Sequence, residues 1–424
     1  MQSKDSVLLT LIFSLAGVVS LCSGAAICGL LGFTQVFSTS GTQGLDALLI
    51  LVLGLAWCAA LLLPGAWYAY QRLQNQPAQD DPAFLGPTPR WREMLPFLLL
   101  LLIYPVTLFL GSLLAERSEL AWWLLPVLQI ITATLPVYWL AGLALRRLQI
   151  GSALRRWSVF AAGLVLGPLM ILVIEIGVIL LASLVYVIQL SSDRARLMEL
   201  AMLSQRLQYA QQDPQVVLEL LEPYIFQPGV MIGVFAFIVV FVPLVEELIK
   251  PVGVWLLANR MLSPTEGFAA GVLSGAGYAL FENLFITPPG GEWALVSIGR
   301  IGTSTMHMLT TGLTGYALAS AWSLKRYLRL GGIFGLAVLI HALWNGLTLL
   351  SVAGVLPESA GLGDLARIGQ LTALGLVMLF LFLFSGLVIT NRRLRRYAII
   401  PRLPQPAAVP DEISLEIPPG RPVE

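Results

Sequence analysis

Residues 229–258, GVMIGVFAFIVVFVPLVEELIKPVGVWLLA, decide the fold. The stretch exceeds the roughly 20 apolar residues that cross the hydrocarbon of a bilayer as a helix. Two adjacent carboxylates, Glu246 and Glu247, and the ammonium of Lys250 interrupt it. Ionisable groups inside a membrane are costly, so they normally face the protein interior or a water-filled cavity. The stretch therefore predicts a membrane helix with a functional polar face.

The composition of the whole chain is typical of a membrane protein. Hydrophobic residues make up 57% of the 424 residues and charged residues only 12%, which is about half the charged share of a soluble domain. We therefore expect an all-α, polytopic bundle of about ten transmembrane helices in a lipid bilayer. The net charge of +1 gives no indication of a nucleic-acid partner. The three cysteines fall within predicted spans and have no zinc-finger spacing.

Basic residues orient the predicted spans. The ten spans cover 7–33, 47–70, 94–114, 120–145, 157–190, 229–258, 265–286, 294–323, 330–351 and 367–390. With the N-terminus inside, the cytoplasmic segments hold 18 of the 25 Lys and Arg residues and the outer segments hold 5. Because Lys and Arg favour the cytoplasmic side of a membrane, both termini are expected in the cytoplasm.

The segment 191–228 divides the spans into two sets of five. Its leucines recur at helical spacing, which predicts an amphipathic helix either on the outer membrane surface or packed on the bundle. The expected regions are an N-terminal membrane region of unknown role, 1–190, this external linker, a second membrane domain, 229–390, and a basic then proline-rich cytoplasmic tail, 391–424. The tail is expected to be disordered.

The acidic pair and the lysine share one sector of their helix, which turns about 100° per residue. In water, such a pattern is commonly a helix-stabilising ion pair. In a membrane, Lys250 offsets only one of the two carboxylates, so the other becomes a candidate general base.

The only two histidines, His307 and His341, lie in apolar segments. Ser304 and Thr311 share the face of His307, and Asn345 lies one turn beyond His341. A lone buried histidine is commonly structural, but the polar stripe around each of these two indicates a functional role.

One further carboxylate, Glu282, continues a glycine stripe of the seventh span, formed by Gly267, Gly271 and Gly275. Such glycines let helix backbones approach closely, which would press Glu282 against a neighbouring helix. It is either functional or a hydrogen-bonded interfacial carboxylate. Similarly, Arg300 either joins the face of His307 or snorkels outward.

Depth in the membrane tests whether these groups can meet. Counted from the cytoplasmic ends of their spans, Glu247 and His341 lie about 11 residues deep, His307 about 16 and Glu282 about 18, which spreads them over about 10 Å. The acid pair and both imidazoles can therefore converge near mid-membrane. Glu175, in the fifth span, has no motif around it and stays unassigned.

Four blocks of this sequence, in their order and internal spacing, resemble the PrsW family of bacterial intramembrane proteases, distant relatives of the CAAX prenyl proteases and bacteriocin-processing membrane proteases. The blocks are EELIK at 246–250, GYALFENL at 277–284, His307 followed by GYA at 315–317, and HALWN at 341–345. The resemblance implies an intramembrane endopeptidase of the bacterial cytoplasmic (inner) membrane, with 229–390 as its catalytic domain. Its substrate would be a membrane-anchored protein, for which an anti-sigma-factor-like regulator is one candidate class.

The expected catalytic residues are Glu246, Glu247, Lys250, Glu282, His307, His341 and Asn345. Glu247, or Glu246, would be the general base, and Asn345 would donate to the oxyanion. The two histidines either bind a divalent metal, with Glu282 as a further ligand, or orient the water directly. Zinc is expected if a metal is bound, although HExxH is absent and the sequence allows both mechanisms.

Two other function classes use the same groups. A proton-coupled transporter would employ Glu and His as a relay, but we detect no internal repeat of the kind common in transporters. A membrane scaffold would retain the fold without catalysis. Substrate fragments that disappear in Glu247→Gln and His341→Ala favour the protease, whereas proton-coupled uptake lost in the same variants favours transport.

Overall fold

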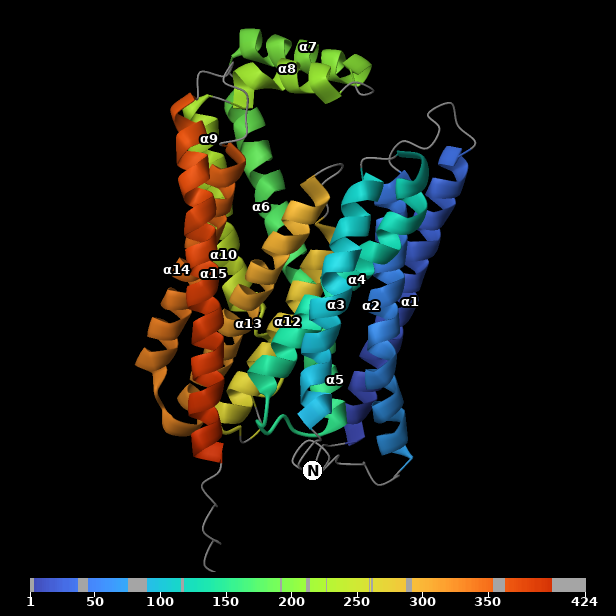
Figure 1. Ribbon diagram of the computed structural model, residues 1–424. Coiled ribbons are helices and arrows are strands. Elements are labelled where there is room, and N and C mark those ends of the chain that lie inside the picture. Colours follow the sequence, from blue (N-terminus) through green and yellow to red (C-terminus); the bar gives the residue numbers. More distant parts are fainter. Residues whose placement is uncertain are drawn as a thin grey trace, which may run out of the picture.

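The computed structural model describes residues 4–36, 45–74, 90–115, 118–190, 193–210, 214–225, 227–258, 260, 262–286, 292–353 and 363–398. All regular secondary structure in these ranges is helical (Figure 1). The N-terminal helices are α1 (Lys4–Val36), α2 (Leu45–Leu73), α3 (Arg90–Ala115) and α4 (Ser118–Leu145). The next continuous segment and the hairpin after it comprise α5 (Ala153–Ala161), the π-helical turn η2 (Ala162–Leu166), α6 (Gly167–Leu190), α7 (Arg194–Ala210) and α8 (Pro214–Ile225). The C-terminal part comprises α9 (Pro228–Ala236), the π-helical turn η3 (Phe237–Phe241), α10 (Val242–Ile249), α11 (Val252–Trp255), α12 (Pro264–Phe285), α13 (Trp293–Leu324), α14 (Tyr327–Ala353) and α15 (Gly363–Ala398).

Eight helical segments of the described chain are long and apolar enough to cross a membrane. They correspond to the predicted spans except 265–286 and 294–323, which form α12 and α13. These two helices are rich in Gly, Ser and Thr and are largely buried at the centre of the bundle (Figure 1). Small residues suit them because protein rather than lipid surrounds them. The all-α, multi-pass membrane fold is confirmed, while ten spans and cytoplasmic termini remain predictions.

Glycines bring α12 and α13 into backbone contact. A Cβ atom added to Gly271 would lie 2.2 Å from the carbonyl oxygen of Thr311, and one added to Gly267 would lie 2.4 Å from that of Gly315. On another face of α12, a Cβ at Gly277 would lie 2.4 Å from the carbonyl oxygen of Phe160 in α5. No side chain larger than hydrogen fits at such contacts, so the stripe sets the spacing of the helices that carry the site.

Two prolines mark the breaks in the helices around the site. Pro168 follows η2, and Pro243 follows η3. Proline lacks an N–H and cannot complete the helical ladder, and π-helical turns accommodate such interruptions. The turn η3 leaves the carbonyl of Ile238 available to Asn345 of α14, whose Nδ2 donates to it at 3.0 Å. The break therefore links the helix of the acid pair to the helix of His341.

The segment that the sequence predicts to be external contains two helices in its described residues. The helices α7 and α8 pair as a hairpin beyond the ends of α6 and α9 (Figure 1). The hydroxyl of Tyr224 donates to Glu199 at 2.7 Å and connects them. The predicted disordered tail lies outside the described residues from 399 onward, whereas α15 continues to Ala398.

Candidate functional site

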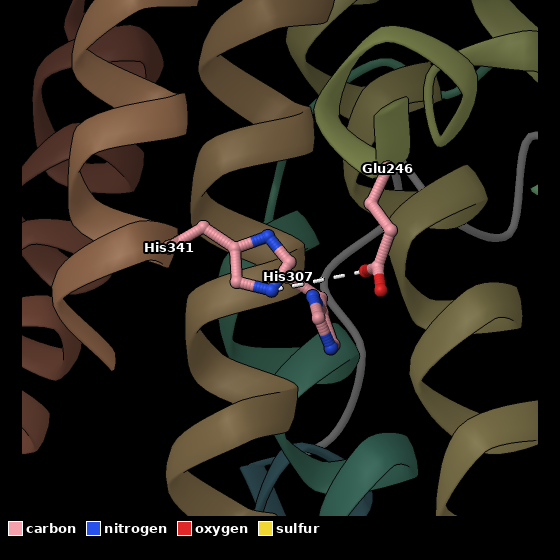
Figure 2. Close-up of side chains that lie close together, drawn as sticks. All are labelled: Glu246, His307 and His341. Carbon is pink, nitrogen blue, oxygen red and sulfur yellow. Dashed lines mark ion pairs between the residues drawn. The ribbon is translucent and has the colours of Figure 1, made fainter. Parts of the chain in front are cut away.

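Glu246, His307 and His341 come from three helices and face one another inside the bundle (Figure 2). They lie on α10, α13 and α14 respectively. One potential ligand atom from each lies within 4.8 Å of the others, and all three residues are buried. Together with Glu247 and Lys250 they form what we term the central cluster.

The ammonium of Lys250 lies in the middle of the central cluster. Its Nζ is 2.7 Å from Glu246 Oε2 and 3.0 Å from Glu247 Oε1. It is also 2.8 Å from His307 Nδ1 and 3.2 Å from His341 Nδ1. The residue is fully buried. Lys250 is thus shared by both acids and both imidazoles, and is more than the partner of one carboxylate.

The backbone at Lys250 is fixed by the end of α10. Its N–H donates to the carbonyl of Glu246 at 2.8 Å and closes the last helical turn. Pro251 follows and cannot continue the ladder. The carbonyl of Lys250 accepts a hydrogen bond from Ser274 Oγ of α12 at 2.6 Å. The backbone that carries the lysine side chain is therefore held to α12.

A carboxylate orients His307. Its Nε2 lies 2.6 Å from Glu282 Oε2, and Glu282 Oε1 pairs with Arg300 Nη2 at 3.0 Å. Arg300 also donates from Nε to Asn283 Oδ1 at 2.9 Å. Because an ionised carboxylate only accepts hydrogen bonds, we assign the proton of the neutral imidazole to Nε2. The lone pair on Nδ1 then faces the central cluster.

His341 is oriented in the same way by Glu247. Its Nδ1 lies 3.0 Å from Glu247 Oε1, and its Nε2 lies 3.8 Å from Glu246 Oε2. By the same reasoning, we assign the proton to Nδ1, so that Nε2 presents its lone pair towards Glu246. Each histidine thus has one nitrogen against a carboxylate and directs the lone pair of the other into the central cluster.

This donor set fits a divalent metal. Two imidazoles and a carboxylate are a common ligand set of catalytic zinc. Metal-bound histidines almost always donate their second ring N–H to an oxygen, as His307 and His341 do here to Glu282 and Glu247. The sequence predicts Glu282 as the carboxylate ligand, whereas the structure groups Glu246 with the histidines and places Glu282 behind His307.

Comparison with known proteins identifies the family. Residues 155–385 match the family described as PrsW family intramembrane metalloprotease, and the match covers more than half of the chain. The chain belongs to the PrsW family of intramembrane metalloproteases. It is therefore an integral, multi-pass membrane protease. No curated protein and no solved structure matches it.

The PrsW match extends well beyond the four blocks of motifs between about 230 and 350. It begins in α5 and includes η2, α6 and the α7–α8 hairpin. The helices α1 to α4 precede it. Packing does not mark this boundary, because α12 contacts α2 and α4 as well as α5 and η2.

Tyr278 of α12 belongs to the site of this PrsW protease, although its role was not predicted. Its ring centroid lies 5.1 Å from that of His307 and 4.7 Å from Lys250 Nζ. The available signal was its place in the block GYALFENL at 277–284, which carries the family resemblance. Glu175 of α6 is half-buried and interacts electrostatically with Glu246. It therefore faces the same side of the bundle.

The side chain of Asn345 has a hydrogen-bond partner outside the central cluster. Its Nδ2 donates to the carbonyl of Ile238 in η3. The sequence predicts an oxyanion donor because Asn345 follows His341 by one helical turn, but the tertiary contact with the π-helical turn uses its amide. This geometry indicates a positioning residue.

Proposed function

We propose that this PrsW protease hydrolyses a peptide bond of a membrane-anchored protein at the central cluster. The observation that carries the proposal is the meeting of both histidines of the chain with the acid pair, from three helices, in the buried interior. Hydrolysis of a peptide bond requires an activated water, a charge that stabilises the oxyanion, and an acid for the leaving amine. Each of these requirements has a candidate group here.

Glu246, His307 and His341 would hold a divalent metal, for which we propose zinc. Bound there, the ion would act as a Lewis acid on the scissile carbonyl and activate the attacking water. Glu246 is the natural carboxylate ligand, because its carboxylate faces the free nitrogen of His341 at 3.8 Å. The carboxylate of Glu282 accepts a hydrogen bond from Nε2 of His307 and is not one of the proposed ligands.

Glu247 is the proposed general base. Its Oε1 contacts Lys250 and His341, whereas its Oε2 is buried and has no hydrogen-bond partner among the described residues. A buried carboxylate oxygen without a partner is costly, so its retention needs a reason. Oε2 would accept a proton from water as the water oxygen attacks the carbonyl carbon. Glu247 would return that proton to the nitrogen of the breaking C–N bond, leaving a carboxylic acid and an amine, and the acid then passes its proton to the amine.

Three residues keep these groups in position. Lys250 holds both acids in place through its two ion pairs. Arg300 holds Glu282, which in turn fixes the ring of His307. Supporting contacts of this kind keep reacting groups within the narrow geometry that hydrolysis needs.

The position of the cluster favours a membrane-anchored substrate. Glu246 and Glu247 lie within the candidate span Pro228–Trp255, and His341 lies within Tyr327–Ser351. A scissile bond must reach this level of the bilayer, which a substrate with its own membrane anchor does most directly. Together with the family, this favours a single-span regulator in the bacterial cytoplasmic membrane.

Co-expression with a panel of tagged single-span proteins tests the proposal. The wild type is expected to produce shortened fragments, and Glu247→Gln and His341→Ala are expected to produce none. Glu199→Gln, on the external hairpin, is the matched control for Glu247→Gln and should cleave normally. Identical fragments from the wild type and both cluster variants would reject the proposed protease site.

A further inference from the structure

The ammonium of Lys250 lies between the residues that would bind a metal ion. Its Nζ lies 2.7–3.2 Å from four atoms of the central cluster, one of them from each residue of the potential metal group. Among the atoms of that group, Glu246 Oε2 and His307 Nδ1 present lone pairs to the ammonium, whereas His341 Nδ1 carries the proton assigned above. An ion pair that only stabilises α10 would need no contacts beyond those with Glu246 and Glu247, one turn away. The additional contacts with histidines of α13 and α14 show that the ammonium joins three helices.

The same donors cannot serve both cations at once. Zinc lies about 2.0–2.2 Å from nitrogen and carboxylate oxygen ligands. His307 Nδ1 and Glu246 Oε2 are the nearest contacts of the ammonium and are also available ligands for a metal. A metal bound by these atoms would therefore take the position of Nζ, and the two positive charges would repel each other in a buried site.

The net charge of the ionised side chains in and beside the cluster leads to the same conclusion. Glu246, Glu247 and Glu282 carry three negative charges, and Lys250 and Arg300 carry two positive charges. With neutral imidazoles, the net charge of this group is −1. A divalent ion added beside the ammonium would bring it to +1, whereas the same ion in the absence of the ammonium would bring it to zero. Buried charges are favourable only when they are paired.

We propose that the ammonium of Lys250 is the resident cation of the central cluster and competes with a divalent metal for Glu246 and His307. It holds the donors together without a metal and lowers the metal affinity of the site. This inference rests on the proposed function for the choice of ligands, but it concerns affinity rather than peptide hydrolysis.

Metal titration of the purified full-length protein tests this competition. Co²⁺ reports histidine and carboxylate ligation by its visible absorption, and Zn²⁺ is then measured by displacement of Co²⁺. Lys250→Met should lower the Kd for both ions by about tenfold or more, because repulsion between a buried unit charge and a divalent ion exceeds the free energy of a tenfold change. Lys4→Met, which removes an exposed lysine, is the matched control and should leave the Kd unchanged.

Two results would overturn the proposal. One is a Kd for Lys250→Met within twofold of the wild-type value, and the other is no metal binding by either protein. Adding His341→Ala to Lys250→Met should abolish the gain, so a gain that persists in the double variant would also reject the proposed site.

Lys250→Met leaves two buried carboxylates without their cation, which destabilises the folded protein. Glu247→Gln/Lys250→Met removes one charge of each sign and retains all three proposed ligands. Compared with Glu247→Gln alone, it should show the same gain in affinity. The tests are independent: absence of proteolysis with the affinity gain intact would reject the proposed function, whereas proteolysis without the gain would reject only the competition.

Discussion

Glu282 Oε2 lies 2.6 Å from His307 Nε2, so this carboxylate determines which nitrogen of His307 faces the central cluster. The two residues come from α12 and α13, whose backbones the glycine stripe holds in contact. The contact between α12 and α13 thus fixes the ring of His307. The nitrogen that it leaves free faces the acid pair and lysine of α10.

Removing this carboxylate should weaken metal binding. Glu282→Ala leaves the Nε2 proton of His307 without its acceptor, and loss of such supporting contacts typically costs about 10–100-fold in metal affinity. Glu282→Gln retains an acceptor oxygen and should lose less. Co²⁺ titration of both variants measures the effect. An unchanged Kd in Glu282→Ala would mean that Glu282 does not orient His307.

Substitutions of the two neighbouring acids should affect metal binding and proteolysis differently. Glu247→Gln retains all three proposed ligands but removes one buried negative charge, so it should still bind one metal ion, with a Kd raised by about tenfold, and lose proteolysis by roughly 100-fold or more. Glu246→Gln should lose both metal binding and proteolysis. Parallel measurements of Kd and cleavage rate check this. The reverse pattern would exchange the roles of ligand and base.

Gly271→Ala should destabilise the contact of α12 with α13. The added Cβ would lie 2.2 Å from the carbonyl oxygen of Thr311, so the helices must separate, and overpacking of this kind costs about 1–3 kcal/mol. Gly177→Ala is the matched control, because its added Cβ meets no atom of the described residues within 4 Å. Thermal unfolding in detergent should show a lower Tm only for Gly271→Ala. Equal Tm values for the two variants would contradict the close contact.

Asn345→Ala separates a positioning role from an oxyanion role. Loss of the hydrogen bond to the carbonyl of Ile238 should cost about 1 kcal/mol of stability, because that partly buried acceptor loses its partner. Cleavage should fall by no more than about tenfold, since the amide stabilises no charge in the transition state. A fall of about 100-fold or more with unchanged stability would instead support the oxyanion role.

The sequence predicted the elements of this site better than its contacts. Helical positions and depth in the membrane can be counted along a chain, so the approach of Glu247, His307 and His341 could be predicted. The partners of Glu282 and Asn345 could not, because they depend on how each helix rotates against its neighbours. Length and polarity alone likewise did not reveal that α7 and α8 pair as a hairpin.

The central position of Lys250 escaped prediction for a related reason. Spacing along one helix shows only its two carboxylate neighbours, whereas its contacts with two histidines arise from α13 and α14. The sequence placed Tyr278 only within the motif block 277–284 and gave it no role. In both cases the deciding contacts join helices that are distant in the sequence.

Metal stoichiometry tests the central claim most directly, because a single site would need side chains from α10, α13 and α14 together. At saturating Co²⁺ or Zn²⁺, the wild type and Glu199→Gln should each bind one ion per chain with the absorption of histidine ligation. Glu246→Gln, His307→Ala and His341→Ala should each lose that ion. Full binding with unchanged absorption in any of these three variants would contradict a shared site built from the three helices.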